Sequence, residues 1–156
     1  MFKEMRRKDK AMAIDDVKSL LVNSEVGVLG TTSVNGFPYL TPLNYVFYKE
    51  KIYFHSAMKG GKIDNIEKDS KVSFCVVSDV KLLREEFDTD YKSVILFGKA
   101  HEVLDDEKSD ALKAFIDKYS PGFEDKGVEY KAKFEKVTRV FAIDIEHITG
   151  KYQETK

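Results

Sequence analysis

The residues that could do chemistry are concentrated between positions 55 and 62 of the sequence. His55 and Ser56 end an apolar run that is typical of a strand, and Gly60, Gly61 and Lys62 come where a short helical pattern begins. Glycines let backbone N–H groups approach an anion, and the unpaired N–H groups at a helix start carry partial positive charge. The stretch therefore predicts a phosphate site in which the Lys62 ammonium pairs with a dianion.

The same stretch has a simpler interpretation. Gly60-Gly61-Lys62 after a strand is also an ordinary turn that carries a solvated lysine. The spacing does not match the GxxxxGK[ST] pattern, because Ile63 follows Lys62, so a P-loop nucleoside triphosphatase is not supported. The phosphate site and the plain turn both stay open at this point.

The other side chains of chemical interest are three histidines and one cysteine. His55, His101 and His147 do not have the spacing of a metal site, and we expect no metal ion. Cys75 cannot form an intramolecular disulfide, and no histidine lies close to it in the sequence. We therefore expect Cys75 to be a packed residue in a reducing compartment, not a nucleophile.

Length and composition describe an ordinary globular protein. The 156 residues predict one domain over 1–156, with an ordered core over 5–150 and a tail over 150–156. The 26 basic and 27 acidic residues nearly cancel, and the one basic cluster, at 5–10, lacks neighbouring aromatic residues, so we expect no nucleic acid partner. No apolar run approaches the roughly 20 residues that span a bilayer, and there is no secretion signal. We expect a cytoplasmic protein with no membrane partner.

The first third of the chain predicts a helix followed by a hairpin. Helical spacing covers Ile14 to Ser24, and Gly27 ends it, with a strand over Val26–Thr32. Asn35-Gly36 is a strong two-residue turn signal, so a second arm runs from Phe37 to Tyr48.

Two prolines in this second arm indicate an edge. Pro38 and Pro42 cannot donate to a sheet ladder, so each should mark an edge position, a bulge or a place where the strand faces something other than another strand. A planar heterocycle would suit such an edge, and so would water.

The rest of the chain predicts further antiparallel strands and two more helices. Strands are expected over 52–55, 71–77, 91–103 and 137–148, a short crossover helix over 63–68, and a longer helix over 104–119. Gly98 is expected to mark a bulge, residues 79–90 a mobile connection and residues 124–136 a looser segment. About six strands without βαβ alternation give an α+β, mainly β fold, a small barrel or curved sheet with helices against it.

Three segments in this order carry a family resemblance. Gly36-Phe37-Pro38-Tyr39-Leu40-Thr41-Pro42-Leu43-Asn44-Tyr45 is followed by Tyr53-Phe54-His55-Ser56-Ala57 and then by Gly61-Lys62-Ile63-Asp64-Asn65. This series resembles the pyridoxamine 5′-phosphate oxidase-like FMN-binding split barrels, and within them it is most similar to the nitroimidazole-resistance group. Residues 5–10 and 92–100 resemble that group as well, so the likeness covers residues 5 to about 150.

The resemblance implies a six-stranded antiparallel split β-barrel with flanking helices, assembled as a homodimer with one FMN per subunit at the interface. By the family pattern, His55 and Ser56 lie beside the ribityl chain and phosphate, Lys62 pairs with the phosphate, and Ser93 contacts the cofactor. The residues implied to line the flavin and ribityl chain are Leu40, Thr41, Pro42, Leu43, Asn44 and Tyr45.

Two departures from the family pattern limit what is carried over. Gly61 stands where many relatives have a second basic residue, so the phosphate site loses one charge unless Lys59 supplies it. The C-terminal arginine and histidine pattern of the vitamin B6 oxidases is absent from 145–151, so pyridoxamine phosphate is not the expected substrate.

The function expected from the resemblance is an FMN-dependent oxidoreductase of nitroreductase type. It would pass electrons from a reduced nicotinamide to a small-molecule acceptor, such as a nitroaromatic or a quinone. The chain has no Rossmann glycine fingerprint, so NAD(P)H would dock transiently. His55 is the candidate catalytic residue, as a proton donor, with a packing role as the alternative.

Two other functions stay open. The first is a module of the same fold that binds flavin, haem or a deazaflavin without turnover. The second is a structural dimer that binds no ligand, whose proline-rich edge only prevents aggregation.

Overall fold

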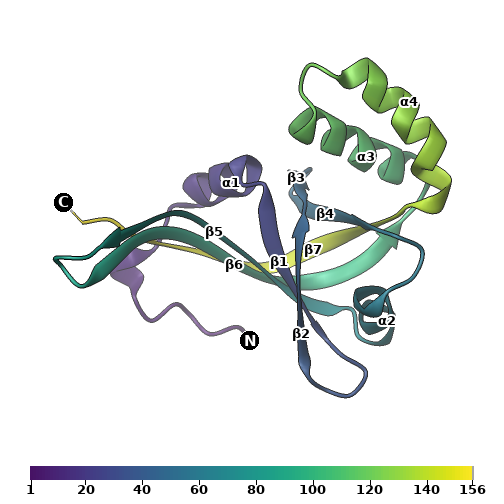
Figure 1. Ribbon diagram of the computed structural model, residues 1–156. Helices are drawn as coiled ribbons and strands as arrows, with labels where there is room; N and C mark the ends of the chain where they lie inside the picture. The colour runs from purple at the N-terminus through teal and green to yellow at the C-terminus, as the bar shows by residue number, and fades with distance from the viewer. Residues whose placement is uncertain (156) are drawn as a thin grey trace.

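The computed structural model describes residues 1–155, and in this range one antiparallel sheet of seven strands organises the chain (Figure 1). The strand order across the sheet is β2-β1-β5-β6-β7-β4-β3. The strands are β1 (Val26–Thr32), β2 (Pro38–Asn44), β3 (Val46–Tyr48), β4 (Lys51–Ser56), β5 (Lys71–Leu83), β6 (Asp88–Val103) and β7 (Arg139–Gln153). The helices are α1 (Ile14–Asn23), α2 (Gly61–Lys68), α3 (Asp105–Tyr119) and α4 (Glu124–Phe134), with 3-10 turns at Lys8–Lys10 and Glu135–Val137.

The seventh strand corrects the expected number of six. The arm expected from Phe37 to Tyr48 is divided at Tyr45, and its two parts lie at opposite edges of the sheet. β2 pairs with β1, and β3 pairs with β4. The division follows from the position of the Tyr45 side chain, which is fully buried in the core.

The edge position expected for the proline-rich arm is confirmed. β2 is the first strand of the sheet and pairs with β1 alone, in a register that places Pro42 opposite Val28 and Pro38 opposite Thr32. An edge strand needs only one of its two rows of backbone groups for pairing, so it tolerates residues that lack an N–H.

The main core lies between the inner face of the sheet and α1. On β5, alternation buries Val72, Phe74 and Val76, while Cys75 is half-buried on the opposite face. Burial raises the pKa of the Cys75 thiol, so the thiolate that would act as a nucleophile is disfavoured. The largest fully buried side chains include those of Tyr45, Tyr53, Phe54, Phe74, Phe141, Leu21 and Leu29.

Residues 79–90 form the end of a long hairpin, so the mobile connection expected there is wrong. The β5–β6 ladder continues past a register shift between Ser78 and Lys81 and reaches the pair Leu83 and Asp88. This hairpin extends beyond the rest of the sheet (Figure 1). Its Val80 and Leu82 side chains are exposed, and without a buried face the segment lacks the usual alternation of a strand.

The last third of the chain is more regular than expected. Residues 124–134 are the helix α4, where a looser segment was expected, and β7 continues through Gly150, opposite Val94, to Gln153. The tail expected over 150–156 is therefore paired up to Gln153, and residue 156 lies outside the described residues.

The bulge expected at Gly98 is confirmed by a register shift in the β6–β7 ladder between Phe97 and Gly98. A Cβ atom at Gly98 would lie 2.1 Å from the backbone oxygen of Asp144, so this close approach requires glycine.

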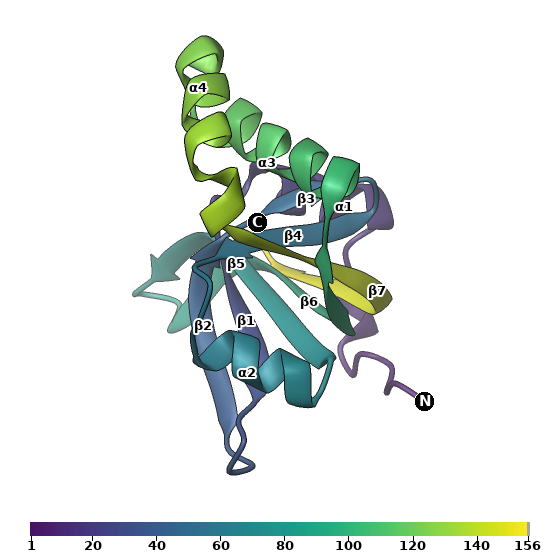
Figure 2. The ribbon, with the colours of Figure 1, turned by 90° about the vertical axis from the view of Figure 1, so that its right-hand side faces the viewer.

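The helices lie on two sides of the sheet. Figure 2 shows α3 and α4 together above β3 and β4, and α2 beside β1 and β2. The expected crossover by α2 does not join neighbouring strands, because β4 lies between β7 and β3 while β5 lies between β1 and β6. None of the helices within residues 1–155 is long and apolar enough to cross a membrane.

Candidate functional site

The end of β4 presents two predicted site residues on its two faces. Ser56 continues the inward row of Ile52 and Phe54 and is only 6% exposed. The His55 side chain lies on the other face, where its ring meets the ring of Phe115 edge-on, with 4.8 Å between the ring centroids. β4 therefore supplies a buried hydroxyl and an imidazole held against α3.

The start of α2 has the geometry of an anion cradle. Gly60 has a φ of +154°, which residues with a side chain rarely adopt, and no atom lies within 4 Å of where its Cβ would be. Its carbonyl accepts the first helical bond, from the N–H of Ile63 at 2.9 Å. No side chain of the described residues caps this helix. The N–H groups of Gly61 and Lys62 are thus available to a ligand beside the half-buried Lys62 side chain, whereas the N–H of Ile63 is bonded to Gly60.

Sequence reasoning missed the pair that fixes α2 in place. The buried Asn65 amide donates a hydrogen bond of 2.9 Å to the Thr31 hydroxyl, which holds α2 against β1. A buried asparagine at a helical position gives no sequence signal beyond its break in the apolar pattern.

The charge of Lys62 reaches His55. Burial of the imidazole, and then the positive charge of Lys62, lower the pKa of His55 below its usual 6.5. His55 is therefore mostly neutral at pH 7, with one ring nitrogen able to donate and the other able to accept a hydrogen bond.

A cavity of about 540 Å³ opens between the end of β4 and the helices α3 and α4. Three of the predicted site residues, Asn44, His55 and Ser56, line this cavity. The aromatic residues that line it are Phe115, Tyr119, Tyr130 and Phe134. Lys62 does not line this cavity, so the cradle and the cavity are separate parts of the candidate site, which are linked by the charge of Lys62 acting on His55.

The predicted flavin-lining run on β2 is distributed over two faces. Leu43 packs against the core, and alternation puts Thr41 on the same face. Leu40 and Pro42 are exposed on the opposite face. The structure therefore does not present these four side chains to one ligand within a single chain.

The remaining predicted residues also lie apart. Asn44 reaches the cavity and donates a hydrogen bond to the backbone oxygen of Glu25 at 3.0 Å. Tyr45 is fully buried, and its hydroxyl donates to the Leu21 carbonyl at 2.8 Å, so its phenol is part of the core. Ser93 is half-buried on β6, and its neighbour Val94 points into the core, which places Ser93 on the outer face of the sheet.

Two buried hydroxyls without a partner test whether a flavin phosphate ester fits this site. Ser56 Oγ and Thr41 Oγ1 are buried and make no hydrogen bond among the described residues. Leaving a buried polar group unpaired costs about 1–3 kcal/mol, so a ligand that supplies the missing partner is favoured. Hydroxyls that lack a partner fit the polar ribityl chain of a flavin nucleotide, whose oxygen atoms can supply the missing hydrogen bonds.

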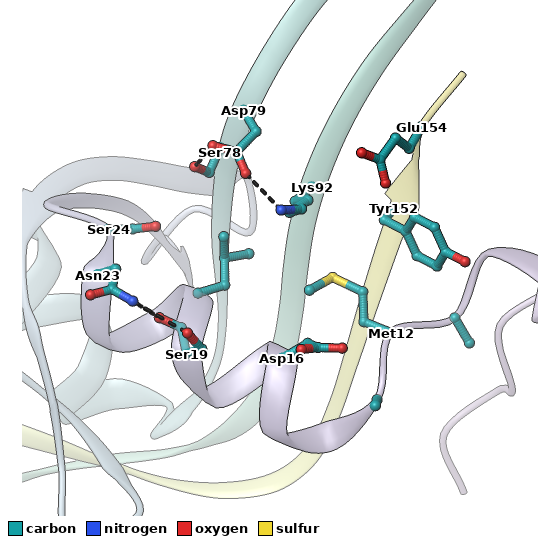
Figure 3. A pocket seen from close by; sticks show the side chains of 13 residues that line it. Met12, Asp16, Ser19, Asn23, Ser24, Ser78, Asp79, Lys92, Tyr152 and Glu154 are labelled. Atoms are coloured by element: carbon teal, nitrogen blue, oxygen red, sulfur yellow. Dashed lines mark hydrogen bonds and ion pairs between the residues drawn. The ribbon is translucent and has the colours of Figure 1, made fainter. Parts of the chain in front are cut away.

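A second cavity, of about 640 Å³, lies between α1 and the β5–β6 hairpin (Figure 3). Its one lysine, Lys92, is bound to Asp79 at 3.0 Å. Asp16 and Glu154 also line this cavity. Three carboxylates against one paired lysine repel a phosphate dianion, so this larger cavity is not the predicted phosphate site.

Two residues of α3 that the sequence did not single out, Lys118 and Tyr119, form hydrogen bonds with the backbone at Tyr45, where the chain passes from β2 to β3. Lys118 donates to the backbone oxygens of Ser24, at 2.5 Å, and Tyr45, at 3.1 Å, and burial lowers its pKa to about 8. The Tyr119 hydroxyl accepts a hydrogen bond from the Tyr45 N–H at 3.0 Å. These hydrogen bonds from Lys118 and Tyr119 fix the position of α3 next to the cavity.

The fold defines a small antiparallel split-barrel protein, and the uncapped start of its short helix α2 is the candidate anion site. The sequence profile of the pyridoxamine 5′-phosphate oxidase family matches residues 14–152. The chain belongs to this family.

Solved structures from several bacteria share the fold. A protein from Bacteroides thetaiotaomicron, described as a candidate 5-nitroimidazole antibiotic resistance protein, is 22% identical with a TM-score of 0.74, covering 91% of this chain and 86% of its own. An FAD-binding protein from Mesorhizobium loti is 22% identical with a TM-score of 0.69, covering 93% and 98%. An FAD- and haem-binding protein from Mycobacterium smegmatis is 18% identical with a TM-score of 0.80, covering 94% and 74%.

These similarities confirm the expected resemblance, the nitroimidazole-resistance group included. At such identities the structural matches establish the fold alone. No curated protein matches the sequence. Among residues 1–155, no group of three histidine, cysteine or acidic side chains is arranged to hold a metal ion.

Proposed function

We propose that the protein is an FMN-dependent oxidoreductase that passes electrons from a reduced nicotinamide to a small acceptor, such as a nitroaromatic or a quinone. Its family and the flavin-binding relatives of the same fold support this proposal. Two observations in neighbouring parts of the chain carry it: the buried, unpartnered hydroxyl of Ser56 at the end of β4, and the absence of a side-chain cap at the start of α2, the next helix.

In this proposal each part of the ligand has a partner. Lys62 and the first-turn N–H groups of α2 hold the phosphate, and the hydroxyls of Ser56 and Thr41 bond to the ribityl chain. The bound flavin supplies the redox chemistry. His55, neutral at pH 7, is the group that can hold or deliver a proton at a ring nitrogen, and the Phe115 ring of α3 packs against it.

The proposal includes a homodimer. The outer face of the sheet exposes Leu40, Val77, Ile95 and Phe97, and an apolar face of this kind favours pairing with a second copy of the chain. Ser93 lies on the same outer face, so a dimer would allow Ser93 to reach the cofactor of the partner subunit. Sedimentation of the FMN-loaded protein should give a dimer, and a monomer that retains FMN would contradict this part of the proposal.

The test is the absorption spectrum of the purified protein, followed by titration of the apoprotein with FMN, FAD and riboflavin. FMN should bind most tightly, since riboflavin lacks the phosphate and FAD must fit its adenosine half outside the cradle. Equal affinity for FMN and riboflavin would show that the start of α2 does not bind the phosphate. A protein that binds none of the three flavins would overturn the proposal.

A second candidate is a haem- or flavin-binding module of the same fold without turnover. Of the three histidines, only His55 lines the described cavity, and its lowered pKa keeps the imidazole neutral, as a haem ligand must be. The two candidates differ in one spectrum, because bound haem gives a Soret band and bound flavin does not.

A further inference from the structure

The Tyr39 side chain of β2 reaches the start of α2, which lies beside β1 and β2 (Figure 2). A Cβ atom at Gly61, the first residue of α2, would lie 3.7 Å from the Tyr39 hydroxyl oxygen and 3.8 Å from the ring carbon that bears it. The phenol is therefore at the same end of the helix as the N–H groups of Gly61 and Lys62. A hydroxyl is a hydrogen-bond donor, so its position adds a third donor to this end.

The Tyr39 hydroxyl is free to bond a ligand. The side chain is 45% exposed, and its hydroxyl makes no hydrogen bond within residues 1–155, whereas the Tyr39 carbonyl accepts one from the Thr31 hydroxyl at 3.4 Å. Water reaches the phenol when no ligand is bound, so its donor is not buried without a partner. A ligand oxygen at the start of α2 would replace that water.

Hydrogen bonds between three elements fix the backbone of Tyr39 relative to α2. Tyr39 lies directly opposite Thr31 in the β1–β2 ladder, and cross-strand neighbours have their side chains on the same face of a sheet. The buried Thr31 hydroxyl accepts a hydrogen bond from Asn65 of α2 at 2.9 Å. The face of β2 that carries Tyr39 is therefore the face that meets α2.

A second hydroxyl on this face also lacks a partner. Thr41 follows Tyr39 by two residues on β2, so their side chains share a face. The Thr41 Oγ1 atom is buried and makes no hydrogen bond among the described residues. This missing partner is independent of the helix start, and it indicates that this face of β2 meets a polar ligand.

We propose that Tyr39 is a phosphate ligand, whose hydroxyl donates a hydrogen bond to a phosphate oxygen of the flavin nucleotide held at the start of α2. The inference rests on the proposed function, because it adds a residue to the phosphate site. Gly61 brings no side chain to this site, and the Tyr39 phenol is the group that lies where a side chain at position 61 would start. Tyr39 thus supplies a neutral donor where a basic residue at position 61 would supply a charged one.

The test compares wild type, Tyr39→Phe and Tyr152→Phe in titrations of the apoprotein with FMN and riboflavin. Tyr39→Phe keeps the ring and removes one oxygen atom, so FMN should bind about 10-fold more weakly, while riboflavin, which has no phosphate, should bind as it does to wild type. Tyr152 is the matched control, a 38% exposed tyrosine on β7 that lines the second cavity. Its variant should change neither affinity.

A second measurement locates the lost contact at the phosphate. The ³¹P NMR signal of bound FMN should shift in Tyr39→Phe and should keep its wild-type position in Tyr152→Phe. Thermal unfolding of the two apoproteins should match wild type, because the Tyr39 hydroxyl makes no hydrogen bond within the described chain.

Three results would overturn the inference. These are equal FMN affinity in wild type and Tyr39→Phe, an equal loss of affinity for FMN and riboflavin, and an unchanged ³¹P signal in Tyr39→Phe. Failure of wild type to bind any flavin would instead refute the proposed function. Binding of FMN in preference to riboflavin by wild type, unaffected by Tyr39→Phe, would refute the role of Tyr39 alone.

Discussion

Lys62 at the start of α2 and His55 at the end of β4 are coupled through charge: burial of the imidazole and then the Lys62 ammonium keep the His55 pKa below 6.5. A phosphate dianion bound by Lys62 would cancel that ammonium. The protonation of His55 therefore reports on whether the cradle is filled.

The first prediction is that FMN raises the His55 pKa and riboflavin does not. Lys62→Ala should raise it in the apoprotein, because one of the two causes of the lowering is removed. NMR titration of the imidazole C–H signals measures both effects, with His55→Ala to assign the signal. An unchanged His55 pKa on FMN binding would place the phosphate elsewhere.

The same lowering has a consequence for stability. The unfolded chain takes up the His55 proton near pH 6.5, and the folded chain does so only at lower pH. The contribution of neutral His55 to stability is therefore complete above pH 6.5 and is lost as the pH falls toward and through the folded pKa. Urea unfolding of wild type and His55→Ala at pH 7.5 and pH 5.5 checks this sign.

The second prediction concerns turnover. His55→Ala should retain FMN and lower reductase turnover by roughly 100-fold if the imidazole donates a proton. Because the protonated form is the minor one at pH 7, the wild-type rate should increase as the pH is lowered toward the His55 pKa. Unchanged turnover in the variant would leave His55 with its packing contact to Phe115.

The third prediction is that Lys62→Ala weakens FMN binding by about 10- to 100-fold. This factor corresponds to the loss of a charge-assisted hydrogen bond of roughly 1.5–3 kcal/mol. Riboflavin affinity should not change. Lys68→Ala is the control, since Lys68 lies at the other end of α2 and donates to the Val34 carbonyl at 2.7 Å. Fluorescence quenching measures the affinity of each variant for both flavins. Equal FMN affinity in wild type and Lys62→Ala would mean that Gly60-Gly61-Lys62 is an ordinary turn and not a phosphate site.

The fourth prediction is a gain of affinity. A Cβ at Gly61 would lie 3.7 Å from the Tyr39 hydroxyl, an ordinary contact, so Gly61→Arg fits the backbone and adds a cation to the cradle. FMN should bind roughly 10-fold more tightly. Gly61→Ala is the matched control, which separates the charge from the change in helix propensity of up to about 1 kcal/mol. If both variants bind FMN equally, the added charge does not reach the phosphate.

The fifth prediction has opposite signs for stability and binding. Ser56→Ala removes a buried hydroxyl that has no partner, so the apoprotein should become more stable by about 1 kcal/mol, while FMN should bind several-fold more weakly. Chemical denaturation of the apoprotein and FMN titration measure the two effects. Loss of stability in the apoprotein would mean that the hydroxyl is satisfied by the protein or by water.

Local chemistry in the sequence predicted part of this fold. The edge position of Pro38 and Pro42 and the bulge at Gly98 each depend on the backbone limits of one or two residues, which can be read from residue type. The two-residue turn expected at Asn35-Gly36 is wrong, because the loop covers residues 33–37, the Gly36 N–H donates to the Ser33 carbonyl at 2.9 Å, and Gly36 alone of the two has a positive φ, of +89°. The contact of Phe54 on β4 with Phe141 on β7 joins segments far apart in the chain, and no local pattern specifies it.

Elements without a buried face were missed for a different reason. α4 has no buried residue, and its contact with α3 depends on Gly127, where a Cβ would lie 2.4 Å from Ile116. A helix of this kind shows no apolar stripe. For the same reason the sequence directed attention to His55 and Lys62 but not to the aromatic wall of the cavity, half of which α4 provides.

The position of β7 also bears on how the chain is made. β7 lies between β6 and β4, and it is the last strand to leave the ribosome. Until Arg139–Gln153 emerges, the β3–β4 hairpin has no place in the sheet, and the apolar side chains of Ile52 and Phe54 remain without their cover. Vectorial synthesis thus leaves the strands β2-β1-β5-β6 and the hairpin β4-β3 unjoined until β7 is made, and their apolar side chains are exposed to aggregation in this interval.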